Sequence, residues 1–110
     1  GVNRVRDFLL KESRNHTRTV YALKCDIRRY FDSIDHEILM SLITRHLHDE
    51  PINELIRTII LSYNSETGKG IPLGNVTSQL FANIHLHELD FFMKHHLKTK
   101  YYARYCDDFI

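Results

Sequence analysis

Apolar residues in the middle of the chain recur every three or four positions, which is the period of an amphipathic helix. One such stripe occupies residues 38–43 and follows Asp35, a residue type that commonly caps the amino terminus of a helix. A second stripe occupies residues 52–63 and follows Pro51, which favours the first turn of a helix. The two stripes predict two consecutive helices, each with one buried face.

The next part of the chain changes from turn residues to a long apolar pattern. Residues 62–74 contain three of the four glycines and predict a loop. Behind this loop, residues 77–97 predict a long helix with several large apolar side chains available for burial. Thr77 and Ser78 are residue types that can cap its amino terminus.

Two segments favour extended structure, residues 19–27 and residues 100–106, because they are rich in β-branched and aromatic side chains. The predicted order is therefore strand, two helices, loop, long helix and strand. This order indicates an α/β (α+β) fold in which a small antiparallel sheet packs on helices.

Composition narrows the class of protein. The 110 residues are 43% hydrophobic and 26% charged, as in a globular protein, and we expect one domain over residues 1–110. No stretch approaches the roughly 18 apolar residues that cross a bilayer, and residues 1–18 lack the apolar core of a secretory signal. The two cysteines are too few for a disulfide scaffold. We therefore expect a cytoplasmic protein with no membrane partner.

Charge is distributed unevenly, although the net charge is only +1. Lys and Arg outnumber acids in residues 1–30 and 91–110, whereas acids dominate residues 31–90. Basic segments beside carboxylates fit a surface that binds a phosphate backbone and holds divalent cations. A solvated helix face explains the amino-terminal charges equally well; these are Arg4, Arg6, Lys11, Arg14 and Arg18.

Three acids fall where the two predicted strands end: Asp26, Asp107 and Asp108. Carboxylates on adjacent strands repel one another unless a cation lies between them. Magnesium suits these hard oxygen ligands, and a pair of Mg²⁺ ions can organise phosphoryl transfer, with Mn²⁺ as an alternative. Taken alone, an Asp-Asp pair at a strand end is more often a solvated turn or a helix cap.

Other conspicuous residues carry no predicted chemistry. His46 and His48, like the later histidine pairs, lack the i, i+4 spacing of helical zinc ligands. Cys25 and Cys106 each precede a predicted site aspartate, so strand alternation should turn them to the opposite face of the sheet. We expect both to be free thiols that act as small core residues.

Three ordered segments, KCDIRRYFDSIDH, GIPLGNVTSQLFANI and YCDD, together resemble the reverse transcriptase family of bacterial retroelements. Residues 24–36 (KCDIRRYFDSIDH) are similar to the first motif of the polymerase palm. Residues 70–84 (GIPLGNVTSQLFANI) are similar to the motif that supports the template and the incoming nucleotide, and residues 105–108 (YCDD) to the Tyr-x-Asp-Asp motif. The resemblance implies a palm fold and RNA-directed DNA synthesis.

The resemblance also implies roles for individual residues. Asp26 and Asp107 would be the principal metal ligands, Asp108 the third acid, and Ile27 a ligand through its backbone carbonyl. The implied nucleotide-binding residues are Phe31, Arg28, Leu73 and Gly74, and the implied template or primer contacts are Asn75, Ser78, Gln79 and Tyr105. Phe31 would exclude a ribose 2′ hydroxyl by its bulk, although ordinary core packing is the alternative for an aromatic residue.

The middle motif departs from the common family pattern. Leu73 stands where most members have Gln, and Ser78-Gln79 replaces Ser-Pro, a combination that resembles the error-prone enzymes of diversity-generating retroelements. Leu73 offers only apolar contact, which fits weaker discrimination at the new base pair. Group II intron and abortive-infection enzymes share the palm and are the alternative lineages.

The predicted protein is the palm of an RNA-directed DNA polymerase from a bacterial or phage host. Its partners would be an RNA template, a DNA or RNA primer and dNTPs, with an accessory protein also considered. Because fingers and thumb motifs are not recognisable, we expect a fragment that is inactive alone. Two other classes stay open: a palm-derived RNA-binding scaffold without catalysis, and a template-independent nucleotidyl transferase or cyclase.

Overall fold

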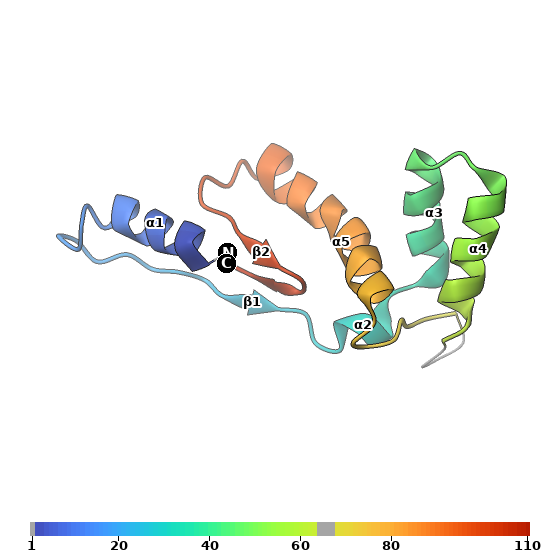
Figure 1. The fold of residues 1–110 in the computed structure, drawn as a ribbon. Helices are drawn as coiled ribbons and strands as arrows, with labels where there is room; N and C mark the ends of the chain where they lie inside the picture. Colours follow the sequence, from blue (N-terminus) through green and yellow to red (C-terminus); the bar gives the residue numbers. More distant parts are fainter. Residues whose placement is uncertain (1, 64–67) are drawn as a thin grey trace. The chain divides into compact units, whose positions relative to one another are not determined.

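The computed structural model describes residues 2–63 and 68–110 (Figure 1). These residues form two compact units. The first unit comprises the chain up to Ile27 together with Leu89–Ile110, and the second comprises Arg28–Glu88. The expectation of one domain over residues 1–110 stays a prediction.

The first unit contains a three-stranded sheet of very short strands, β1 (Cys25–Asp26), β2 (Arg104–Tyr105) and β3 (Asp108–Phe109). The strand order is β1-β3-β2, and both pairs are antiparallel (Figure 1). The small antiparallel sheet is confirmed, but the predicted strands at 19–27 and 100–106 were too long. Extended chain becomes a strand only where it has a hydrogen-bonded partner, and this restricts the ladder to a few residues.

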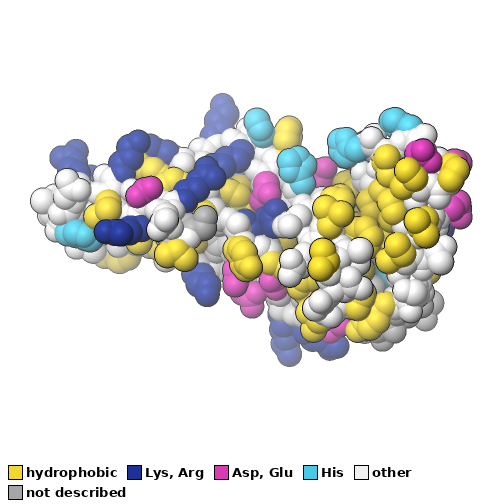
Figure 2. All heavy atoms as spheres, in the orientation of Figure 1, with side chains coloured by type: hydrophobic (Ala, Val, Ile, Leu, Met, Phe, Trp, Pro, Cys, Tyr) yellow, Lys and Arg dark blue, Asp and Glu magenta, His cyan; other side chains and the backbone are white. Residues whose placement is uncertain are grey.

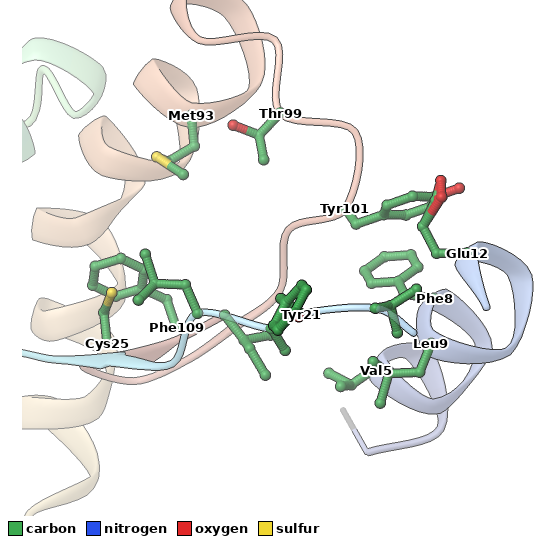
Figure 3. Close-up of a pocket in the computed structure, with 14 residues that line it drawn as sticks. Val5, Phe8, Leu9, Glu12, Tyr21, Cys25, Met93, Thr99, Tyr101 and Phe109 are labelled. Carbon is green, nitrogen blue, oxygen red and sulfur yellow. The ribbon is translucent and has the colours of Figure 1, made fainter. Parts of the chain in front are cut away.

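Helix α1 (Val2–Glu12) was not predicted as an element from the sequence. Its apolar residues Val5, Phe8 and Leu9 recur at helical spacing and line an apolar cavity of about 250 Å³ (Figure 3). The helix is followed by three consecutive residues with positive φ, at 14–16. Arg4, Arg6 and Lys11 on α1 are exposed, which suits a solvated helix face and a phosphate-binding surface equally, so both interpretations stay predictions.

The second unit is built from helices α2 (Tyr30–Ser33), α3 (His36–His46), α4 (Glu50–Leu61) and the greater part of α5 (Val76–Phe91). The two predicted neighbouring helices are confirmed as α3 and α4. Asp35 accepts a hydrogen bond from the backbone N–H of Ile38 at 3.1 Å, and Asp49 does the same for Ile52 at 3.1 Å. Both amino termini are therefore capped by side-chain carboxylates.

Helix α5 confirms the predicted long helix, although its start differs from the prediction. It begins at Val76 and continues as a π-helix, η1 (Phe92–His96). Asn75, rather than Thr77 or Ser78, provides the side-chain oxygen at the start, accepting from the Thr77 backbone N–H at 3.2 Å. Ser78 is already inside the helix and buried, so it cannot act as a cap.

The core of the second unit joins the first and middle motifs. Ile34, Leu39, Ile60 and Ile71 are each at most 1% exposed. The segments at 31–36 and 68–71 also exchange backbone hydrogen bonds, including Ile71 N–H to the Phe31 carbonyl at 2.9 Å. These contacts fix the loop that precedes α5 against α2, because each buried backbone group needs a partner.

Part of the surface of the second unit is apolar. Figure 2 shows hydrophobic side chains gathered over α3 and α4, and exposed members include Ile38, Ile52, Leu55 and Ile59. Within the described ranges, no helix has the length and apolar character that crossing a membrane requires.

Candidate active site

Asp26 on β1 and Asp108 on β3 are direct partners in the antiparallel ladder. Side chains of directly opposed residues lie on the same face of a sheet, with Cβ atoms typically about 4.5–5.5 Å apart. Asp26 is exposed and Asp108 is half-buried. Two of the three predicted carboxylates therefore lie on one face of the sheet, although they are 82 positions apart in the sequence.

Asp107 lies in the two-residue turn that joins β2 to β3, beside Asp108. Tyr105 and Asp108 close the turn as Cα partners, and Cys106 adopts a left-handed φ of 54°. A positive φ at the first turn residue is typical of tight hairpins, whose twist it matches. The sequence had placed Cys106 in a strand, and that placement was wrong because the chain reverses there.

The two cysteines are free thiols, as predicted. Cys25 lies in β1 opposite Phe109, and both line the apolar cavity that Figure 3 shows. Cys106 is half-buried in the turn, and burial is the main cause that raises the pKa of its thiol. The sheet therefore has an apolar face with Cys25 and Phe109 and a polar face with Asp26 and Asp108.

The donor chemistry at the polar face fits a hard divalent cation, because opposed carboxylates supply oxygen ligands and repel each other without a counter-charge. The geometry is less complete than the sequence suggested. In residues 2–63 and 68–110, no group of three or more His, Cys, Asp or Glu side chains stands close enough together to hold a metal ion. Convergence of Asp107 with the other two acids stays a prediction.

A groove of about 740 Å³ runs along the first unit beside Asp108. Much of its lining is apolar, but it also includes Tyr105, which is 81% exposed. Four lining side chains are basic or can become so: Arg6, His16, Lys24 and Arg104. Positive side chains therefore lie near Asp108, and binding of phosphates or metal ions there stays a prediction. Ile27, the predicted carbonyl ligand, follows β1 directly and is half-buried.

Phe31, the predicted sugar-contacting residue, lies in α2 of the second unit and is half-buried. Its ring meets the Tyr30 ring edge-on at a centroid distance of 5.5 Å. Tyr30 occupies the core position instead: it is 3% exposed, and its hydroxyl donates to the Ala82 carbonyl at 3.1 Å. Tyr30 is therefore the core residue, whereas part of the Phe31 ring stays accessible to solvent. Arg28 is exposed nearby in the sequence.

The Tyr30 hydroxyl also forms a 3.0 Å hydrogen bond with Nδ1 of His85. Burial lowers the pKa of His85, and the Asp35 carboxylate opposes this effect only in part. His85 is therefore held towards its neutral form, which suits a partly buried ring bonded to a hydroxyl.

The middle-motif residues that were predicted to bind nucleotide or template differ in their exposure to solvent. Leu73 is 73% exposed, Gly74 has a φ of +77°, and Asn75 and Gln79 are exposed. Ser78, in contrast, is 1% exposed, and its hydroxyl has no hydrogen-bond partner among the described residues. The roles of these residues in nucleotide or template binding stay predictions.

One polar cluster, centred on Asp90, was not found from the sequence. The Asp90 carboxylate, near the end of α5, accepts hydrogen bonds from Arg104 of β2 and from Tyr102. Arg104 in turn donates to the Cys106 carbonyl at 2.8 Å. In the sequence, the one indication of this cluster is Arg104, which lies just before the turn that carries Asp107.

A known protein family matches almost the whole chain. The family model described as reverse transcriptase (RNA-dependent DNA polymerase) matches residues 3–110. The chain belongs to the reverse transcriptase family. This finding confirms the predicted family, and the mixed helix and sheet structure agrees with a palm. The predicted closeness to diversity-generating retroelements stays a prediction.

Several curated relatives align with most of this reverse transcriptase chain. The group II intron-encoded protein LtrA of Lactococcus lactis subsp. cremoris is 39% identical over 82 residues, 69% of this chain. An uncharacterized 91 kDa protein in the cob intron of Schizosaccharomyces pombe is 35% identical over 69% of the chain, and protein YkfC of Escherichia coli K12 is 31% identical over 67%. The aligned part spans 14%, 10% and 21% of these relatives.

Proposed function

We propose that the protein containing this chain is an RNA-directed DNA polymerase and that the chain is part of its catalytic palm. The observation that carries the proposal is the register of the sheet, which sets Asp26 opposite Asp108 in a chain that matches the family model over residues 3–110. Two opposed carboxylates beside a groove with Lys24 and Arg6 suit an anionic substrate bound through cations.

Asp26 and Asp107 are the proposed principal ligands for two Mg²⁺ ions, with Mn²⁺ as an alternative, and Asp108 and the Ile27 carbonyl complete the proposed set. Such ions, when bound, neutralise the charge that develops on the phosphoryl oxygens. Asp26 and Asp108 contribute negative charge on one face, and their mutual repulsion is relieved when a cation binds. The exposed Tyr105 on the same face is available to a primer end.

Residues of the second unit are proposed to select the nucleotide. Phe31 presents a half-buried ring that would collide with a ribose 2′ hydroxyl, while Arg28 is free to approach phosphates. Leu73 and Gly74 are exposed next to the start of α5, where they can contact a nascent base pair. Asn75 and Gln79 are the proposed template contacts; Ser78 would need the helix to open before it could join them.

Primer extension tests the activity. The full-length protein, supplied with a primed RNA template, dNTPs and Mg²⁺, should extend the primer. The double variant Asp107→Asn and Asp108→Asn should lose extension, because two ligand charges are removed without a change in side-chain size. A matched control is Glu50→Gln with Glu54→Gln on α4, which removes two exposed acids and should extend normally.

Failure of the folded wild-type protein to extend any primer, in the presence of its cellular RNA and accessory proteins, would refute the proposal and favour an RNA-binding scaffold. Turnover of nucleoside triphosphates without primer or template would favour a cyclase or terminal transferase instead. Sequencing of the products addresses the lineage: errors concentrated opposite template adenine would support a diversity-generating retroelement, and accurate copies would favour an intron-type enzyme.

A further inference from the structure

Asp90 and Arg104 form an ion pair behind the turn that carries Asp107, and we propose that this pair positions the turn for catalysis. Arg104 and Asp90 are positioning residues in this proposal, since they act through the turn backbone. The catalytic consequence rests on the proposed polymerase function, whereas the control of turn geometry does not. We call the Asp90–Arg104 pair, together with the bond from Arg104 to Cys106, the turn clamp.

The geometry of the turn clamp is that of a strong, oriented interaction. Arg104 donates through Nε to Asp90 Oδ1 and through Nη2 to Asp90 Oδ2, both at 2.7 Å. This is the bidentate arrangement in which a planar guanidinium fixes the direction of its partner as well as its distance. The remaining nitrogen, Nη1, donates to the Cys106 carbonyl at 2.8 Å.

The turn clamp is also shielded from solvent. The Arg104 side chain is 10% exposed and the Asp90 side chain 29% exposed. Tyr102, which is 4% exposed, donates its hydroxyl to Asp90 Oδ1 at 2.7 Å, so the carboxylate is held from two directions. Burial is the main cause that raises the pKa of Tyr102 to about 12, and the hydrogen bond to Asp90 is the second cause. The hydroxyl therefore stays a donor at neutral pH.

The bond from Arg104 falls on the peptide that leads into Asp107. The Cys106 carbonyl and the Asp107 N–H belong to one rigid peptide plane, so a fixed carbonyl direction restricts where the Asp107 side chain points. Cys106 also has a left-handed φ of 54°, which a residue with a Cβ adopts only at an energetic cost. A hydrogen bond on this carbonyl therefore holds a turn conformation that the sequence alone disfavours.

The turn clamp acts from behind the carboxylates. Arg104 is the Cα partner of Phe109, one position away from Asp108 along β3. Side chains alternate between the faces of a sheet, so Arg104 and Phe109 lie on the face opposite to Asp108. Arg104 also borders the groove beside Asp108, but its guanidinium is engaged by Asp90 and by the Cys106 carbonyl. A conservative change in it should therefore alter the turn and leave the carboxylates chemically intact.

A second ion pair provides a matched control. Glu88, also on α5, pairs with Arg45 at 3.2 Å, but the two side chains are 52% and 57% exposed. Exposed pairs of this kind contribute little to stability or order. The change Glu88→Gln therefore makes the same carboxylate-to-amide substitution as Asp90→Asn, two residues away, without touching the turn.

The first measurement reports on the turn without polymerisation. The folded full-length protein is exposed to iodoacetamide, and labelling of Cys106 and Cys25 is followed by mass spectrometry of their peptides. Asp90→Asn should accelerate labelling of Cys106 roughly threefold or more, because a half-buried thiol gains exposure as the turn loosens. Labelling of Cys25 should be unchanged, and Glu88→Gln should match wild type at both thiols.

The second measurement is steady-state extension of a primed RNA template at increasing Mg²⁺ concentration. Asp90→Asn and Arg104→Lys should each lower kcat roughly 10- to 100-fold and raise the Mg²⁺ midpoint, with an unchanged KM for the primed template. Lys keeps the charge but cannot bridge Asp90 and the Cys106 carbonyl with a planar fork. The double variant should be no worse than either single variant, because both break one linked set of bonds.

Each outcome has a definite meaning. Unchanged labelling of Cys106 in Asp90→Asn, or a lower kcat with an unchanged Mg²⁺ midpoint and additive effects in the double variant, would overturn the turn clamp. Equal acceleration at Cys25 and Cys106 would also overturn it, since that indicates general loosening. A wild-type protein that does not extend primers would refute the polymerase proposal, while faster labelling of Cys106 in Asp90→Asn would still support the control of turn geometry.

Discussion

Asp26 and Asp108 are Cα partners across an antiparallel strand pair, so two acids stand side by side on one face of a small sheet. Like charges that are directly opposed across strands are destabilising. The arrangement is explained most simply if the folded protein gains more from binding a cation there than it loses from repulsion.

Replacement of one acid should therefore stabilise the metal-free protein. We expect Asp108→Asn to raise the free energy of unfolding by about 0.2–1 kcal/mol without Mg²⁺, because it removes the cross-strand repulsion. Mg²⁺ should raise the melting temperature of wild type more than that of the variant. Thermal unfolding with and without Mg²⁺ measures both effects, and a variant that is stabilised by Mg²⁺ as strongly as wild type would contradict the proposed ligand role.

Phe31 and its neighbour Tyr30 should respond differently to truncation. Phe31→Ala should increase ribonucleotide incorporation, since the half-buried ring is the proposed steric barrier. Tyr30→Ala should instead destabilise the fold by about 3–5 kcal/mol, because it empties a core position. Incorporation ratios for rNTP and dNTP, beside melting curves, separate the two. Unchanged sugar selectivity in a folded Phe31→Ala protein would remove Phe31 from the proposed site.

Gly74 is expected to tolerate Asn better than Val. Its φ of +77° strains any residue with a Cβ, whereas a Cβ built there meets nothing within 4 Å. Gly74→Val should cost about 1–2 kcal/mol and Gly74→Asn less, because Asn enters the left-handed region more readily. Unfolding curves of the two variants test this ranking, and equal stability would show that the turn has adopted another conformation.

Ser78→Ala should leave the fold intact or stabilise it. The Ser78 hydroxyl is buried and has no hydrogen-bond partner among the described residues, so its removal relieves a desolvation cost of about 1–3 kcal/mol. Ser41→Ala, which removes a hydroxyl that does bond to a backbone carbonyl on an exposed surface, is the comparison. A clear loss of stability in Ser78→Ala would indicate that the hydroxyl has a partner in solution.

The pH dependence of stability should contain a contribution from His85. Burial lowers the pKa of His85 below its ordinary value of 6.5, so the unfolded chain binds more protons in the window just below that value. The contribution is fully present above pH 6.5 and is lost as the pH falls through the folded pKa. His85→Asn should flatten this part of the profile, and His87→Asn, at an exposed position of the same helix, should not.

The sequence by itself determined helices α3, α4 and α5, but not the short helix α2. It also pointed to Asp26, Asp107 and Asp108, whose role as site acids stays a prediction. Asp35 and Asp49 cap helices because capping depends on residues only three positions apart, and such local geometry is encoded in a short stretch of chain. The ordered motifs likewise led to the correct family, since they consist of contiguous residues.

Only the tertiary structure decided the features that depend on contacts between residues far apart in the sequence. The sequence could not show that Asp108 begins a third strand, because strand pairing is set by register with β1, or that Cys106 lies in a left-handed turn. The apolar stripe of α1 is short, and no helix was predicted there, although Val5, Phe8 and Leu9 recur at helical spacing. The bond between Asp90 and Arg104 joins side chains on a helix and a strand, and their meeting follows from packing in space rather than from spacing along the chain.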